Sequence, residues 1–138
     1  MLPAGTTLSR YVIEGPLGTG GMGSVYRARD THLDREVALK VLSADGSSLG
    51  DSDARNRMVR EARAVATLNH PNAVSIYDAG DSDHGPFIVM ELVEGETLRA
   101  KMGSASPSEI IAWMSMTGLA LHAAHARGIV HRDVKPEN

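Results

Sequence analysis

Lys40 places an ammonium group inside an otherwise apolar segment, residues 37–42 (Val-Ala-Leu-Lys-Val-Leu). Such a run predicts a buried strand, in which a charge costs free energy unless an opposite charge compensates it. Glu61 has the converse problem, because it falls on the apolar face of a predicted helix over residues 53–69. An ion pair between Lys40 and Glu61 would satisfy both groups. Taken singly, each group has an ordinary alternative. Lys40 would lie at a strand edge with its ammonium group in solvent, and Glu61 would be a solvated acid on the helix surface.

The other apolar patterns predict an α+β fold, in which a sheet-rich half precedes a helical one. Ser106, Pro107 and Gly128 are typical of the cap, the first turn and the stop of a long helix. The expected strands lie near residues 12–13, 25–28, 37–42, 73–79 and 87–93, and the expected helices lie at residues 53–69, 97–102 and 107–127.

Residues 18–25 contain four glycines in the pattern G-x-G-x-x-G-x-V. Glycine lets a backbone approach a phosphate closely, because no side chain intervenes. The same pattern occurs in dinucleotide-binding folds, where it opens a helix and an acidic residue follows about 20 positions later. Here the glycines lie between two strand-like segments, which favours a hairpin. A flexible turn remains the alternative for this motif alone.

Composition excludes several classes of protein. The 138 residues contain no cysteine, so disulfides, thiolate metal sites and a cysteine nucleophile are excluded. The net charge of −3 gives no electrostatic footprint for nucleic acid or for an anionic membrane. The N-terminus lacks the basic and apolar regions of a signal peptide. The longest uncharged stretch, residues 110–126, is short for a membrane span.

The last eight residues are His131-Arg132-Asp133-Val134-Lys135-Pro136-Glu137-Asn138. These residues resemble the catalytic loop of the eukaryotic-type (Hanks-type) serine/threonine protein kinases. The glycine run, Lys40, Glu61 and the segment 87–95 precede them in the order that is typical of this family. The glycine run and residues 125–130 look most like the bacterial members. The resemblance covers residues 11–138.

The resemblance implies a protein-kinase-like fold, with an antiparallel-sheet N-lobe, one main helix and the first helices of a helical C-lobe. It divides the chain into a lead-in at residues 1–10, an ATP-binding N-lobe at 11–93, and a hinge exit and C-lobe start at 94–138. No D-F-G motif follows Asn138 in this sequence. We therefore expect an N-terminal portion of a kinase domain that is inactive by itself.

The resemblance also implies the site residues. Asp133 acts near the acceptor hydroxyl, Lys135 contacts the transferred phosphate, and the Lys40–Glu61 pair holds the other phosphates. Asn138 is the implied magnesium ligand, and His131 is implied to pack inward. The implied ATP-binding residues are Leu17, Gly18, Thr19, Gly20, Gly21, Met22, Gly23, Val25, Ala38, Lys40, Met90, Glu91 and Val93.

The implied activity is transfer of the ATP γ-phosphate to protein Ser or Thr hydroxyls with Mg²⁺. We expect a protein substrate, no nucleic-acid partner and no membrane contact from this segment. We also expect a cytoplasmic location, and the resemblance leaves room for a dimer of kinase domains and for a membrane anchor further along the chain. Two alternatives remain, a non-catalytic nucleotide-binding or pseudokinase-like module and a dinucleotide binder.

Overall fold

The computed structural model describes residues 1–20, 23–42, 59 and 65–137. Gly21, Met22, Glu61 and Asn138 lie outside the described residues, and so does most of the predicted helix at 53–69. The chain divides into two compact units. The first unit comprises Met1–Thr67 with Ser75–Leu92, and the second comprises Leu68–Val74 with Val93–Asn138.

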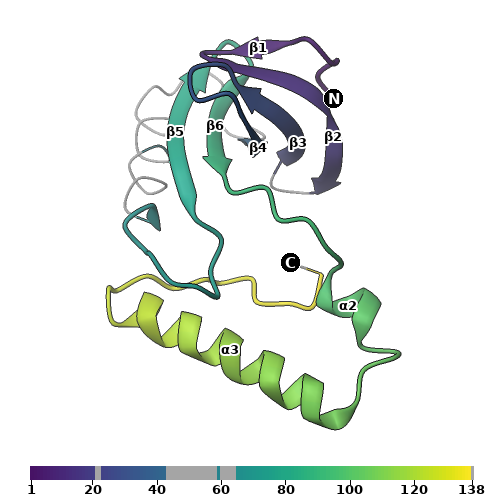
Figure 1. Ribbon diagram of the computed structural model, residues 1–138. Coiled ribbons are helices and arrows are strands. Elements are labelled where there is room, and N and C mark those ends of the chain that lie inside the picture. The colour runs from purple at the N-terminus through teal and green to yellow at the C-terminus, as the bar shows by residue number, and fades with distance from the viewer. Residues whose placement is uncertain (21–22, 43–58, 60–64, 138) are drawn as a thin grey trace. The chain divides into compact units, whose positions relative to one another are not determined.

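The first unit is built on a six-stranded antiparallel sheet with strand order β1-β2-β3-β4-β6-β5 (Figure 1). Consecutive strands pair as hairpins except at β4, which pairs with β6. The strands are β1 Thr7–Leu8, β2 Tyr11–Gly20, β3 Gly23–Asp30, β4 Arg35–Leu42, β5 Ile76–Ser82 and β6 Gly85–Met90.

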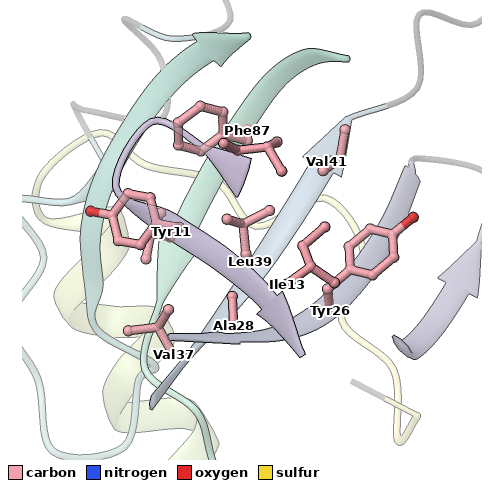
Figure 2. Close-up of a cluster of buried hydrophobic side chains, with 10 residues drawn as sticks. Tyr11, Ile13, Tyr26, Ala28, Val37, Leu39, Val41 and Phe87 are labelled. Carbon is pink, nitrogen blue, oxygen red and sulfur yellow. The ribbon is translucent and has the colours of Figure 1, made fainter. Parts of the chain in front are cut away.

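One face of this sheet carries the hydrophobic core. Tyr26, Leu39 and Val89 lie opposite one another on β3, β4 and β6, and each is at most 2% exposed. The rings of Tyr11 and Phe87 make an edge contact with centroids 6.1 Å apart, although β3 and β4 separate β2 from β6 in the sheet. The sheet is therefore strongly curled around its core (Figure 2). The core residues are Leu8, Tyr11, Ile13, Tyr26, Ala28, Val37, Leu39, Val41, Phe87 and Val89.

The second unit contains the short helix α2, Leu98–Lys101, and the long helix α3, Pro107–His125. Ser106 and Glu109 form a reciprocal capping box at the start of α3, and Pro107 lies at its first position. Gly128 follows the end of α3 with φ 72°, and its amide donates to the His125 carbonyl. Within α3 only Ala124 is buried. Neither of these two described helices is long and apolar enough to cross a membrane.

The predicted strands and helices are present where the structure describes the chain, but several ends differ. The strand predicted to begin at residue 73 begins at Ile76, because the chain turns first and the Ala73 amide donates to the His70 carbonyl. The strand predicted to end at residue 93 ends at Met90, where the pairing of β6 with β4 and β5 stops. Helix α3 ends at His125, two residues before the predicted end.

Candidate functional site

The described part of the glycine run lies where β2 ends and β3 begins, and Gly20 pairs with Gly23 there. Leu17, Gly18, Thr19 and Gly20 are all exposed. Among the described residues, a Cβ atom added at Gly18 or Gly20 would have no neighbour within 4 Å, so the backbone there is open. This open backbone is the part of the run that is available to a ligand.

Gly23 is required for a different reason. Its φ is 133°, and a Cβ atom there would collide with the carbonyl oxygen of Val41 on β4. Only glycine tolerates both this backbone conformation and such a close approach. Gly23, the last glycine of the run, therefore allows the close pairing of β3 with β4, and its predicted part in nucleotide binding stays a prediction.

Four of the predicted ATP-binding residues share the sheet face opposite the core. In an antiparallel sheet, directly paired residues project to the same face, as do residues two apart on one strand. Val25 pairs with Lys40, and Ala38 pairs with Met90. Lys40 and Ala38 are two apart on β4, so all four residues lie on one face. Gly18, paired with Val25, joins them at the hairpin.

The segment after β6 is anchored to the residue that precedes β5. The Glu91 amide donates to the Ser75 carbonyl at 2.9 Å, and the Glu91 carboxylate accepts from the Ser75 amide at 3.2 Å. These contacts use the amide and the carboxylate of Glu91 and not its carbonyl, the group that sequence reasoning assigned to adenine. Val93, the other residue so assigned, is 62% exposed and belongs to the second unit.

In the second unit, residues 131–137 bring two of the predicted catalytic side chains together, those of Asp133 and Lys135. The Lys135 Nζ atom lies 2.8 Å from Asp133 Oδ2, and this hydrogen bond and charge raise the pKa of Lys135. The Asp133 amide donates to His131 Nδ1 at 3.3 Å. His131 is exposed, so the expectation that it packs inward is wrong for this structure, because the described residues around it do not cover it.

Arg132 holds a left-handed backbone conformation, with φ 65°. For a residue with a Cβ atom this conformation costs roughly 1–2 kcal/mol. Such strain persists only where the surrounding structure compensates it, and it is concentrated at functional sites. The turn at Arg132 lies directly before Asp133.

The end of the same segment is tied to α2. The Arg99 amide donates to the Pro136 carbonyl at 2.9 Å, and Arg99 Nε donates to Glu137 Oε1 at 2.8 Å. The hydrogen bond from Arg99 lowers the pKa of Glu137. Sequence reasoning did not select Arg99. No local pattern links it to Glu137, which lies 38 positions along the chain.

A second charged cluster holds the first unit together. Asp30 is fully buried, and its carboxylate accepts hydrogen bonds from the amides of His32 and Leu33 and lies 3.3 Å from the Nε atom of Arg10. A further guanidinium, that of Arg35, lies 3.9 Å away. The cluster joins β3, β4, the turn between them and Arg10, which directly precedes β2, and it was also missed by sequence reasoning.

Comparison with known proteins identifies the class. The profile of the protein kinase domain family matches residues 11–138, and the chain therefore belongs to the protein kinase family. It is 46% identical over 133 residues to serine/threonine-protein kinase PknL of Mycobacterium tuberculosis, and 46% identical over 132 residues to serine/threonine-protein kinase PrkC of Bacillus subtilis. Each match covers 94% of this chain, 33% of PknL and 20% of PrkC.

The fold is also similar to solved kinase structures. A crystal structure of the M. tuberculosis PknI kinase domain superimposes with a TM-score of 0.85 and 33% sequence identity. The match covers all of this chain and 56% of that structure. The predicted protein-kinase-like α+β fold and the resemblance to bacterial serine/threonine kinases are thus confirmed. The chain spans only a third or less of the length of these two curated relatives.

Proposed function

We propose that this chain binds ATP on the first unit and supplies the catalytic loop of a serine/threonine protein kinase from the second. One observation carries the proposal: the strand register places Val25, Ala38, Lys40 and Met90 on one sheet face, beside the open backbone of the glycine hairpin. An alternative dinucleotide-binding fold would open a helix at this run, whereas here the run joins two antiparallel strands.

The residues present fit a nucleotide. Val25 and Ala38 offer small apolar surfaces for a flat base, Met90 lies opposite Ala38, and the segment through Glu91 and Val93 supplies backbone groups for its edge. The open backbone of Leu17, Gly18, Thr19 and Gly20 fits a phosphate chain, and residues 21–23 complete the run. Lys40 supplies the positive charge on the same face, and Glu61 is its proposed partner.

Asp133 and Lys135 are the proposed catalytic pair. In the transfer, the acceptor hydroxyl oxygen forms a bond to the γ-phosphorus, and the bond to the β,γ-bridging oxygen breaks. ADP leaves with that electron pair, and the hydroxyl proton passes to Asp133. Lys135, which is now paired with Asp133, would turn to the transferred phosphate. A magnesium ion, when bound, neutralises phosphate charge, and Asn138 would hold it through its side-chain oxygen.

The proposed organisation keeps residues 11–93 as the nucleotide-binding lobe and residues 94–138 as the hinge exit and catalytic loop. The acceptor is a protein Ser or Thr hydroxyl. Lys135 supports this assignment because, by resemblance, serine/threonine kinases carry a lysine at this position. The proposal also includes a cytoplasmic kinase domain and the formation of kinase dimers.

The proposal is tested with the Asp133→Asn substitution, made in a form of the protein that transfers phosphate. Loss of the carboxylate should lower kcat by about 100-fold or more, the usual contribution of a general base. Nucleotide affinity should stay within about twofold, because the base and the phosphates bind elsewhere. The matched control is Asp83→Asn, the same chemical change at an exposed turn residue.

Two assays separate loss of catalysis from loss of binding: radiolabelled phosphate transfer to a protein acceptor, and nucleotide binding by calorimetry. Both assays are also run on the Lys40→Met variant. Near-normal transfer by the Asp133→Asn protein would contradict its catalytic role. Nucleotide binding without transfer in a form that includes the rest of a kinase domain would favour the alternative function, a non-catalytic nucleotide-binding module. Unchanged nucleotide affinity in Lys40→Met would remove Lys40 from the phosphate site.

A further inference from the structure

Arg99 joins α2 to the proposed catalytic loop through two separate groups. Its backbone amide donates to the Pro136 carbonyl, and its side chain donates to the Glu137 carboxylate. The first amides of a helix have no partner within the helix, so a carbonyl from elsewhere satisfies this one. The two contacts fix consecutive residues of the loop, and those residues directly follow Lys135.

The side-chain contact is well formed but exposed. Arg99 Nε and Glu137 Oε1 are 2.8 Å apart, while the side chains are 63% and 47% exposed. An exposed ion pair contributes little to folding, because water competes for both charges. Its main consequence is local, since it removes freedom from the end of a loop in which Lys135 contacts Asp133 and the Asp133 amide contacts His131.

We propose that Arg99 is a positioning residue for phosphoryl transfer, acting through Glu137 on the segment that carries Asp133 and Lys135. The inference rests on the proposed kinase function. Arg99 fixes the end of the segment from α2, and the hydrogen bond from the Asp133 amide to His131 Nδ1 closes the turn at its beginning. A loop held at both ends presents Asp133 and Lys135 in one arrangement, and a small displacement of reacting groups lowers the rate of transfer.

The experiment uses Arg99→Ala in a catalytically active form of the protein. The backbone bond to Pro136 survives this change, so only the side-chain contact is removed. We expect kcat to fall about fivefold, the equivalent of the ~1 kcal/mol upper limit for an exposed pair. The KM for ATP should stay within about twofold, because Arg99 is not among the proposed nucleotide-binding residues. The magnesium concentration for half-maximal rate should rise, since Asn138 follows Glu137 directly.

Lys101→Ala is the matched control. Lys101 lies on the same helix and forms a similar exposed pair, 3.1 Å from Glu96, but it does not contact the catalytic loop in the described structure. This variant should leave kcat, the KM for ATP and the magnesium dependence unchanged. Arg99→Lys should retain part of the rate, because an ammonium group can still pair with Glu137.

A double-mutant cycle tests whether Arg99 acts through Glu137. The single variants Arg99→Glu and Glu137→Arg should both lose rate, and the charge-swapped double variant should recover a substantial part of it. The midpoint of thermal unfolding should be nearly the same in all variants, which separates positioning from a general loss of stability.

Four outcomes would overturn the inference. The first two are a kcat of Arg99→Ala equal to that of Lys101→Ala, and Arg99 and Glu137 substitutions whose effects on kcat are independent in the cycle. The other two are a lowered melting temperature that accounts for the lost rate, and a rise in the KM for ATP with no change in kcat. These results are distinct from failure of the proposed function, which Asp133→Asn reports. If Asp133→Asn abolishes transfer and Arg99→Ala does not change it, the kinase assignment stands and only the role of Arg99 falls.

Discussion

At the scale of single residues, Asp30 is a charge that the fold has fully enclosed. Burial alone would raise the pKa of its carboxyl group. Hydrogen bonds from the amides of His32 and Leu33, and the charges of Arg10 and Arg35, outweigh burial and hold the pKa below its usual value. The ionised form is therefore the one that stabilises the folded state.

Replacing Asp30 by Asn should lower the free energy of unfolding at pH 7 by roughly 3–5 kcal/mol, because two guanidinium groups lose their buried partner. Since the folded pKa is lowered, the stabilisation is complete above the usual Asp pKa of about 3.9 and is lost as the pH falls through the folded value. The difference between wild type and variant should therefore shrink in acid. Urea unfolding at several pH values measures it.

The exposed Asp83→Asn variant serves as the reference, with an expected change within about 0.5 kcal/mol at pH 7. A constant difference between wild type and Asp30→Asn across the acid range would show that the Asp30 carboxylate is not the stabilising group. The Arg10 guanidinium also contacts Asp78, whose Oδ2 atom lies 3.3 Å away. The same oxygen accepts a hydrogen bond from the Tyr11 hydroxyl at 2.8 Å.

At the scale of elements, the β2–β3 hairpin combines two requirements within a few residues. Gly23 lets β3 approach β4, whereas at Gly18 and Gly20 no atom of the described residues lies within 4 Å of an added Cβ, and the backbone is open. Substitution of Gly23 should therefore lower stability, whereas substitution of Gly18 or Gly20 should mainly weaken nucleotide binding.

Gly23→Ala should destabilise the protein by about 2 kcal/mol or more, because the added Cβ atom meets the Val41 carbonyl and the backbone conformation is strained. Gly20→Ala should change stability by less than about 1 kcal/mol. The Gly20 variant should instead weaken nucleotide binding, since its methyl group projects into the open side of the hairpin. Thermal unfolding and calorimetric nucleotide titration of both variants test the contrast, and equal losses of stability would contradict it.

At the scale of the whole molecule, the two units differ in how their apolar residues are placed. The first unit encloses a continuous core from β1 to β6. In α3 only Ala124 is buried, and several large apolar side chains are at least half exposed, namely Ile111, Met114, Met116 and Leu119. Local stability follows burial, so the units should open at different free energies.

Amide hydrogen exchange on the 138-residue chain should show this difference directly. Amides paired among β3, β4 and β6 should exchange at least about tenfold more slowly than those in the middle of α3, a difference of ~1.4 kcal/mol in opening free energy. Uniform protection across both units would mean that they unfold as one cooperative body. Concentration-dependent protection confined to α3 would instead show that association covers its apolar side chains.

Much of the fold was predictable because the relevant signals are local. Strand periodicity, the cap at Ser106 and the stop at Gly128 depend on neighbouring residues, and they lie where the sequence indicated. The predicted Lys40–Glu61 pair remains a prediction, since Glu61 lies outside the described residues. The strand ends at residues 73 and 93 were placed wrongly because pairing partners, not local propensity, decide where a ladder stops.

The sequence by itself determined the order of the elements, the positions of the glycines and the set of candidate catalytic side chains, because each depends on residues close together in the chain. Only the tertiary structure decided the register that places Val25 opposite Lys40, the burial of Asp30, and the contact between Arg99 and Glu137. These features join residues up to 38 positions apart, as in the Arg99–Glu137 pair. Such contacts form only when the strands and helices have packed, because no propensity of the separate segments selects one distant partner over another.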